Sequence, residues 1–350
     1  MLGFKKLMLA NAYCRRLALL LLGPLLLPAC QSRHEPAAVA ATPPVGHYEG
    51  TITPAGQAAV RAALDIRHPS PGHYEAELTV PGAGTLGFVA DTIFFADKQL
   101  RLTRPARPSE SLTLTLDGDF WRGTLALDSL RTEALLVKRG TPTPSAYHVE
   151  ELPQGTGSAW RFAPADTSTP GPALALLPTA ATAATAALWA DALAREGTIV
   201  LVLPAADSTT ADTESPRLLS ALQLLRSTAG ADTATIGLWA CGARGTAVAQ
   251  ALLKPGLRVA FLIAQNTEVD AASREAFREL SGTKLPMLGL YSGPTAVRQA
   301  AGLRKALGGR RGVTVQTYRG AGPDLLVPGG AMPAFGSGLP GNVAEWLRSR

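Results

Sequence analysis

The fold of this chain is decided by one stretch, Ile236-Gly237-Leu238-Trp239-Ala240-Cys241-Gly242-Ala243-Arg244-Gly245. Its first half is apolar throughout, which is typical of a strand that is buried on both faces of a sheet. Small residues follow directly, and a helix is predicted from about Gly245 to Leu253. A strand that passes through a short turn into a helix is the repeating unit of α/β proteins.

Similar apolar runs lie on both sides of this stretch, and helical segments separate them. The predicted strands lie at 173–177, 198–203, 235–240, 259–263, 286–291 and 313–318. The predicted helices include an alanine-rich one that ends near 194, one at 217–227 and a closing one at 343–348. Alternation of this kind predicts that residues 171–350 form a mostly parallel sheet covered by helices on both faces.

Residues 45–139 have a different pattern, in which short strands with alternating apolar and polar residues are separated by turns. Pro69-Ser70-Pro71-Gly72 and Asp117-Gly118-Asp119 are two of these turns. Such a pattern predicts a small antiparallel all-β domain, either a sandwich or a barrel. Its histidines have no carboxylate or cysteine at a ligand spacing, so we predict neither a metal site nor a cofactor.

Residues 140–170 are rich in Thr, Pro, Ser and Gly. This composition predicts an interdomain linker. His148 falls within it, and its recruitment into a distant site is the one route by which an imidazole would serve the second domain.

The first 30 residues predict a lipoprotein signal peptide. Four basic residues and no acidic one precede an apolar run of about 11 residues, which is too short to span a bilayer comfortably. The run ends in Leu27-Pro28-Ala29-Cys30, which resembles the bacterial lipobox, in which the cysteine is lipidated. Residues 31–44 would then be a tether, and the protein would be anchored to the bacterial cell envelope. Gln31 and Ser32 provide no acidic retention signal, which favours the outer membrane.

Charge and cysteine content restrict the partners. The formal net charge of +6 falls to +2 without the four leader cations, and the remaining charges form no dense cluster. This distribution argues against nucleic acid as a partner. Cys241 is the one cysteine left after Cys14 and Cys30, so no intramolecular disulfide is expected.

The stretch at 236–245 resembles the strand, elbow and helix of the α/β-hydrolase family, in which the motif Gly-x-Ser-x-Gly holds the nucleophile. Aligning the strand and the last glycine places Ala240 on the first glycine of the motif and Gly242 on the serine. Residues 45–139 likewise resemble the small β-rich domain that precedes the catalytic domain in some secreted bacterial members. The resemblance implies a hydrolase fold, but Gly242 has no nucleophilic side chain.

The other two members of the family's triad also lack a counterpart. The loop expected to hold the acid has Pro294 near that position, and the loop expected to hold the histidine has Pro323. Residues 151–350 contain no histidine. Because proline neither ionises nor donates a hydrogen bond, the resemblance implies a degenerate catalytic triad.

An alternative is that Cys241 is the nucleophile, as in the dienelactone-hydrolase branch of the family. A position at a helix N-terminus beside Arg244 would lower the pKa of its thiol. The opposing interpretation is that Cys241 packs as a small apolar residue. In either case Arg244, Tyr291 and Asp324 are candidates to line a pocket at the carboxyl ends of the strands.

These observations favour a lipid-anchored envelope protein whose α/β domain is inactive and binds an unknown small molecule or envelope protein. The alternative is a weak hydrolase of esters, thioesters or peptide bonds that uses Cys241. A third hypothesis is that the β domain carries the function and the second domain is structural.

Overall fold

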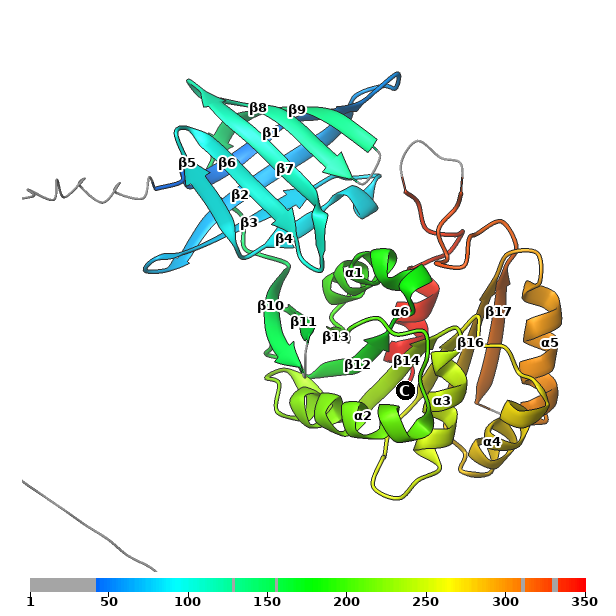
Figure 1. Cartoon of the computed structure of the whole chain (residues 1–350). Coiled ribbons are helices and arrows are strands. Elements are labelled where there is room, and N and C mark those ends of the chain that lie inside the picture. Colours follow the sequence, from blue (N-terminus) through cyan, green and yellow to red (C-terminus); the bar gives the residue numbers. More distant parts are fainter. Residues whose placement is uncertain (1–41, 128–129, 155–156, 310–311, 329–332) are drawn as a thin grey trace, which may run out of the picture. The chain divides into compact units, whose positions relative to one another are not determined.

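The computed structural model describes residues 42–127, 130–154, 157–309, 312–328 and 333–350. The predicted signal peptide, Cys30 and most of the predicted tether lie outside the described residues. Within these limits the strands form two sheets (Figure 1).

The first sheet is antiparallel and is formed by the predicted β domain. Its strands are β1 (Gly46–Pro54), β2 (Val60–Ser70), β3 (His73–Thr79), β4 (Phe88–Ala90), β5 (Ile93–Ala96), β6 (Gln99–Arg104), β7 (Arg107–Asp117), β8 (Phe120–Leu127) and β9 (Leu130–Gly140). A single 3-10 turn, η1 (Gly84–Leu86), precedes β4. The strand order is β4-β3-β2-β1-β9-β8-β7-β6-β5, so β1 lies in the interior of the sheet.

This sheet curls around its own core and is therefore closer to a barrel than to a sandwich. Strands near its two ends, β4 and β6, contact each other. Alternate side chains point inward, and the enclosed cluster includes Tyr48, Ile52 and Trp121, none of them more than 1% exposed. Apolar and polar residues alternate along each strand because one face of the strand is buried and the other meets solvent.

The second sheet contains both antiparallel and parallel strands. Its members are β10 (Tyr147–Gln154), β11 (Gly157–Pro164), β12 (Gly171–Leu177), β13 (Ile199–Val202), β14 (Ala231–Cys241), β15 (Leu262–Gln265), β16 (Met287–Ser292) and β17 (Val313–Tyr318). The order is β10-β11-β13-β12-β14-β15-β16-β17. The strands from β12 onward are parallel, as the sequence predicts for 171–350.

Six helices cover the two faces of this sheet in the described part of the chain. They are α1 (Ala180–Arg195), α2 (Ala211–Arg226), α3 (Arg244–Leu252), α4 (Ala271–Gly282), α5 (Ala296–Leu307) and α6 (Gly341–Arg348). Side chains of α1 and α6 pack into one apolar cluster, and those of α2 to α5 pack into another (Figure 1). Strands buried between two such layers are apolar at every position.

The sequence predicts an interdomain linker at residues 140–170, but part of this segment forms strands in the structure. It contains the antiparallel hairpin of β10 and β11, and β11 continues the second sheet by pairing with β13. Tyr147 and Val149 are buried while His148 and Glu150 are exposed, which is strand alternation. The surrounding Thr, Pro and Gly residues obscured this short pattern.

Three helices differ from the sequence prediction, and two of them, α4 and α5, were not predicted. Helix α2 begins at Ala211 rather than at 217, because Thr210 and Thr213 form a capping box at its start. Helix α4 was not predicted, although Asp270 accepts a hydrogen bond from the Ser273 N–H (2.7 Å) and caps it.

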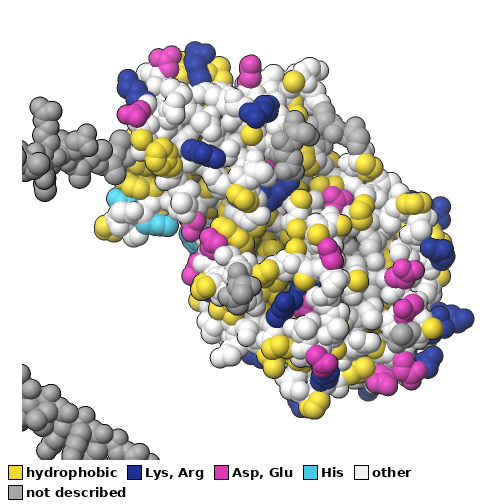
Figure 2. Space-filling view, in the orientation of Figure 1, with side chains coloured by type: hydrophobic (Ala, Val, Ile, Leu, Met, Phe, Trp, Pro, Cys, Tyr) yellow, Lys and Arg dark blue, Asp and Glu magenta, His cyan; other side chains and the backbone are white. Residues whose placement is uncertain are grey.

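Charged and polar groups connect elements of the two sheets. Arg195 of α1 donates to Glu77 of β3 (2.6 Å), and the Val89 N–H of β4 donates to the Tyr147 hydroxyl of β10 (3.0 Å). His148 bonds Glu75 of β3 at 2.8 Å. Elsewhere, basic and acidic side chains are interspersed over the visible face (Figure 2).

We predict that Gly50→Ala destabilises the first sheet. A Cβ at this interior position of β1 would lie 1.9 Å from the Leu135 carbonyl oxygen of β9. We expect urea unfolding to show a free energy lower by about 1–3 kcal/mol. The control Gly140→Ala has open space around its Cβ and should change stability by less than about 0.5 kcal/mol. Equal stabilities for the two variants would contradict the packing described here.

Candidate functional site

The turn after β14 has the geometry of a sharp elbow. Gly242 separates the end of β14 from the start of α3 and has a backbone φ of 55°. This left-handed region is unfavourable for residues with a Cβ and accessible to glycine. The Gly242 N–H donates to the Gln265 carbonyl of the neighbouring strand β15 (2.8 Å). The elbow is therefore present, and the residue at its tip has no side chain.

The elbow lies where the direction of chain winding reverses. Strand β12 has β13 on one side and β14 on the other, so the chain crosses the sheet in opposite directions before and after β13. Ligands bind to open α/β sheets at the carboxyl ends of the strands beside such a switch point. A Cβ on Gly242 would lie 3.2 Å from Thr179, in the loop that joins β12 to α1.

The backbone N–H groups of this loop bond to the protein itself. In the α/β-hydrolase family the corresponding loop supplies an N–H group to the oxyanion hole. Here the Thr179 N–H donates to the Thr182 hydroxyl (3.0 Å), and the Ala180 N–H donates to the Asp207 carboxylate (2.8 Å). These two donors are consequently occupied by side chains of the chain itself.

Two amide side chains at the end of β15 bond to the loop after β17, on the other side of the elbow from Thr179. Gln265 and Asn266 both donate to the Pro323 carbonyl oxygen, at 2.9 and 2.8 Å. Asn266 also donates to the Ser292 hydroxyl (2.8 Å) and accepts from the Ser292 N–H (2.8 Å). Gln265 and Asn266 were not singled out from the sequence. Two consecutive amides directly after a buried strand are the signal that would have found them.

The three positions that replace the expected triad are connected only in part. Gly242 and Pro323 both bond to Gln265, one to its backbone oxygen and one to its side-chain nitrogen. Pro294 is exposed and lies between β16 and α5, two residues after Ser292, the last residue of β16. None of the three has a side chain that transfers a proton.

Arg244 is fully buried and forms a bidentate ion pair with Glu214 of α2. Its Nε and Nη2 each lie 3.0 Å from a Glu214 oxygen, and the Glu214 side chain is 0% exposed. Arg244 Nη1 also donates to the carbonyls of Pro178 and Pro204, both at 2.9 Å. The guanidinium thus joins α2 and α3 to the loops after β12 and β13.

Cys241 is enclosed in the core and does not face the crevice as an exposed thiol. It is 2% exposed, and its Sγ donates to Gln265 Oε1 (3.4 Å). Burial raises the pKa of the thiol to about 12, the direction opposite to that required by the alternative of a cysteine nucleophile. This environment matches the interpretation of Cys241 as a small packed residue.

The other candidate residues serve local structure. Tyr291 is 0% exposed and donates to the Thr267 carbonyl (3.0 Å), and burial raises its pKa. Asp324 accepts from the Leu326 N–H (3.1 Å) within its own loop. The sequence predicts that Tyr291 lines a pocket, but the structure places it in the core. His148 contacts Glu75, whose hydrogen bond raises the pKa of the imidazole.

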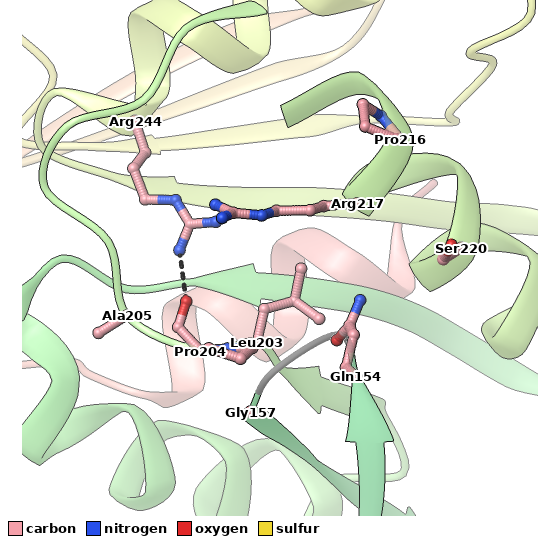
Figure 3. Close-up of a pocket in the computed structure, with 9 residues that line it drawn as sticks. All are labelled: Gln154, Gly157, Leu203, Pro204, Ala205, Pro216, Arg217, Ser220 and Arg244. Carbon is pink, nitrogen blue, oxygen red and sulfur yellow. Dashed lines mark hydrogen bonds between the residues drawn. The ribbon is translucent and has the colours of Figure 1, made fainter. Parts of the chain in front are cut away.

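A cavity of about 540 Å³ opens beside the Arg244 ion pair (Figure 3). It lies between the carboxyl end of β13, the first half of α2 and the β10–β11 hairpin. Its lining consists of Gln154, Gly157, Leu203, Pro204, Ala205, Pro216, Arg217, Ser220 and Arg244. Of the candidate pocket residues, Arg244 reaches it. The described residues contain no cluster of three side chains suited to bind a metal ion.

Comparison with known proteins identifies similar folds only. No protein-family model and no curated protein matches this chain. A sugar hydrolase from Lactococcus lactis is 12% identical with a TM-score of 0.46, over 58% of this chain and 98% of the other. The isopeptidase AtxE2 is 12% identical with a TM-score of 0.44, over 82% of this chain and 60% of the other. An ester hydrolase from the metagenome of Lake Arreo is 15% identical with a TM-score of 0.38, over 51% and 75%.

By their names, the first and the third of these similar structures are hydrolases. Identities and TM-scores this low do not transfer any of their activities to the chain.

We predict that Arg244→Met strongly destabilises the protein, because the buried Glu214 carboxylate loses both 3.0 Å bonds and keeps only the half-exposed Arg217 at 3.9 Å. The expected loss in urea unfolding is about 3–5 kcal/mol. The double variant Glu214→Met with Arg244→Met should recover part of that loss. Lys254→Met, which breaks the exposed ion pair with Asp212, is the control and should cost less than about 1 kcal/mol. If Arg244→Met lowers the free energy of unfolding as little as Lys254→Met does, the structural role of Arg244 is refuted.

We also predict that Cys241 resists alkylation in the folded protein. The thiolate is the reactive form, and a pKa near 12 leaves very little of it at pH 8. Iodoacetamide should label the native protein at least about 1000-fold more slowly than free cysteine, and at the normal rate after unfolding in urea. A native rate profile with a midpoint below about pH 8.5 would contradict the burial described here.

Proposed function

We propose that this protein is a lipid-anchored protein of the bacterial cell envelope whose α/β-hydrolase-like domain binds a ligand or partner and does not hydrolyse it. The observation that carries this proposal is Gly242 at the tip of the elbow, where a nucleophile would be required. A serine or cysteine nucleophile also needs a base, and residues 151–350 contain no histidine.

The occupied backbone donors support the same proposal. Stabilisation of an oxyanion requires N–H groups that point at the reacting atom and are not already bonded. The Thr179 and Ala180 N–H groups bond Thr182 and Asp207 instead. An acyl group bound beside Gly242 would therefore find neither an attacking group nor these two donors.

Attachment to the envelope rests on the sequence before the folded domains. Cys30 at the end of an apolar run would carry the lipid, and residues 31–44 would be the tether, with the outer membrane as the proposed location. Among the described residues, no helix combines the length and the apolar character needed to cross a bilayer.

Hydrolysis is the second candidate, and the preserved elbow is the observation that favours it. The turn at Gly242 keeps a positive φ directly before a helix, and the similar structures named above are hydrolases. The residue available on this hypothesis is Cys241, which would have to become exposed and lose its proton. Its burial and raised pKa make this the less favoured function.

The purified chain is expected to hydrolyse p-nitrophenyl acetate and p-nitrophenyl butyrate no faster than the same amount of unfolded protein. The physical reason is that the crevice lacks a nucleophile and a base. The Cys241→Ala variant should give the same background rate. Turnover by the wild type that disappears in Cys241→Ala would replace the binding function by the hydrolase alternative.

A further inference from the structure

Among the residues that the structure describes, the cavity beside the Arg244 ion pair is lined by one further guanidinium, that of Arg217, whose nearest carboxylate is already bonded to Arg244. Arg217 lies on α2 and its side chain is 50% exposed. Its closest acidic atom is a Glu214 oxygen at 3.9 Å, but both Glu214 oxygens already accept from Arg244 at 3.0 Å. Figure 3 shows the guanidinium of Arg217 directed across the cavity toward that of Arg244. Two guanidinium groups around one carboxylate leave a net positive charge there.

The remaining walls of the cavity are mainly apolar and uncharged. Leu203, Pro204 and Ala205 follow β13, and Pro216 precedes Arg217 on α2. The lining contains no acidic residue. Arg244 has four of its five N–H groups bonded to Glu214 and to backbone carbonyls, so Arg217 is the side chain free to rearrange around a ligand.

Two neutral polar side chains complete the lining. Ser220 lies one turn after Arg217, on the same face of α2. Gln154 at the end of β10 has a buried Oε1 with no hydrogen-bond partner among the residues that the structure describes. That oxygen is turned away from the cavity, and Figure 3 shows the amide nitrogen of Gln154 on the cavity side, where it can donate to an acceptor of a ligand.

We propose that this cavity binds a small organic monocarboxylate with an apolar body and a carbonyl acceptor, of the kind found in an N-acylated amino acid. The carboxylate bonds Arg217, because the planar guanidinium matches two carboxylate oxygens. The apolar body lies against Leu203 and Pro216, and the acyl carbonyl oxygen accepts from the Gln154 amide. This inference names the ligand class for the proposed binding function and rests on it.

Charge and size favour a carboxylate over a phosphate monoester. A single negative charge matches the one uncompensated positive charge, whereas a dianion would leave an excess charge against apolar walls. A cavity of about 540 Å³ is within the usual range for small-molecule sites. It is large enough for a molecule such as N-acetyl-L-leucine.

The test is calorimetric titration of the full chain in detergent with N-acetyl-L-leucine, its neutral amide N-acetyl-L-leucinamide, hexanoate and phenyl phosphate. We expect N-acetyl-L-leucine to bind best and its amide to bind at least about 10-fold more weakly, because only the acid forms the charge-assisted bonds. Hexanoate keeps the charge but lacks the acyl carbonyl, so its affinity should lie between the two.

Variants of α2 then locate the site. Arg217→Gln removes the charge at an exposed position and should weaken binding of the acid about 10–100-fold, with little effect on the amide. Arg217→Lys keeps the charge without the bidentate geometry and should lose less. The matched control is Arg226→Gln at the other end of α2, where the side chain donates to the Arg258 carbonyl outside the cavity.

The proposal is overturned if neither carboxylate binds below roughly 10 mM, if acid and amide bind equally, or if Arg217→Gln binds the acid as the wild type does. Tighter binding of phenyl phosphate than of N-acetyl-L-leucine would also overturn it. Failure of the proposed function has a separate signature, namely turnover of the nitrophenyl esters. Turnover together with binding of the acid through Arg217 would leave the ligand class intact and refute only the absence of catalysis.

Discussion

The buried ion pair between Arg244 and Glu214 fixes the positions of the loops after β12 and β13 relative to α2 and α3. A guanidinium removed from water must be matched by a counterion and by acceptors for its remaining N–H groups. Glu214 supplies the first and the carbonyls of Pro178 and Pro204 supply the second. Movement of either loop would leave a buried charge unsatisfied, so the loops after β12 and β13 are held together with α2 and α3.

Around this pair, polar groups at the carboxyl ends of the strands are bonded to one another. Asp207 accepts a hydrogen bond from the Ala180 N–H at the start of α1. Gln265 and Asn266 donate to the Pro323 carbonyl in the loop after β17, and Asn266 also donates to Ser292 at the end of β16. In α/β-hydrolase enzymes, polar groups at the carboxyl ends of the strands point toward the substrate. Here they connect the loops, and the cavity next to Arg217 is displaced from the elbow toward the edge of the sheet.

The sequence predicted those features that depend on local patterns. Continuous apolar runs located the parallel strands from β12 onward, and alternating runs indicated the antiparallel sheet. The hairpin of β10 and β11 was missed because its short alternation lies among turn-forming residues. The partnership of Arg244 with Glu214 was missed for another reason. The two residues are separated by 30 positions, and no periodicity reports which distant charge will meet a buried guanidinium.

The interior position of β1 would have a mechanical consequence if the N-terminal segment holds the protein to a membrane, as we propose. The chain enters the first sheet through β1, which is paired with β2 on one side and β9 on the other. Tension applied along that strand would load both hydrogen-bond ladders in shear, so many bonds would have to rupture together. An edge strand under the same pull could peel away one pair at a time.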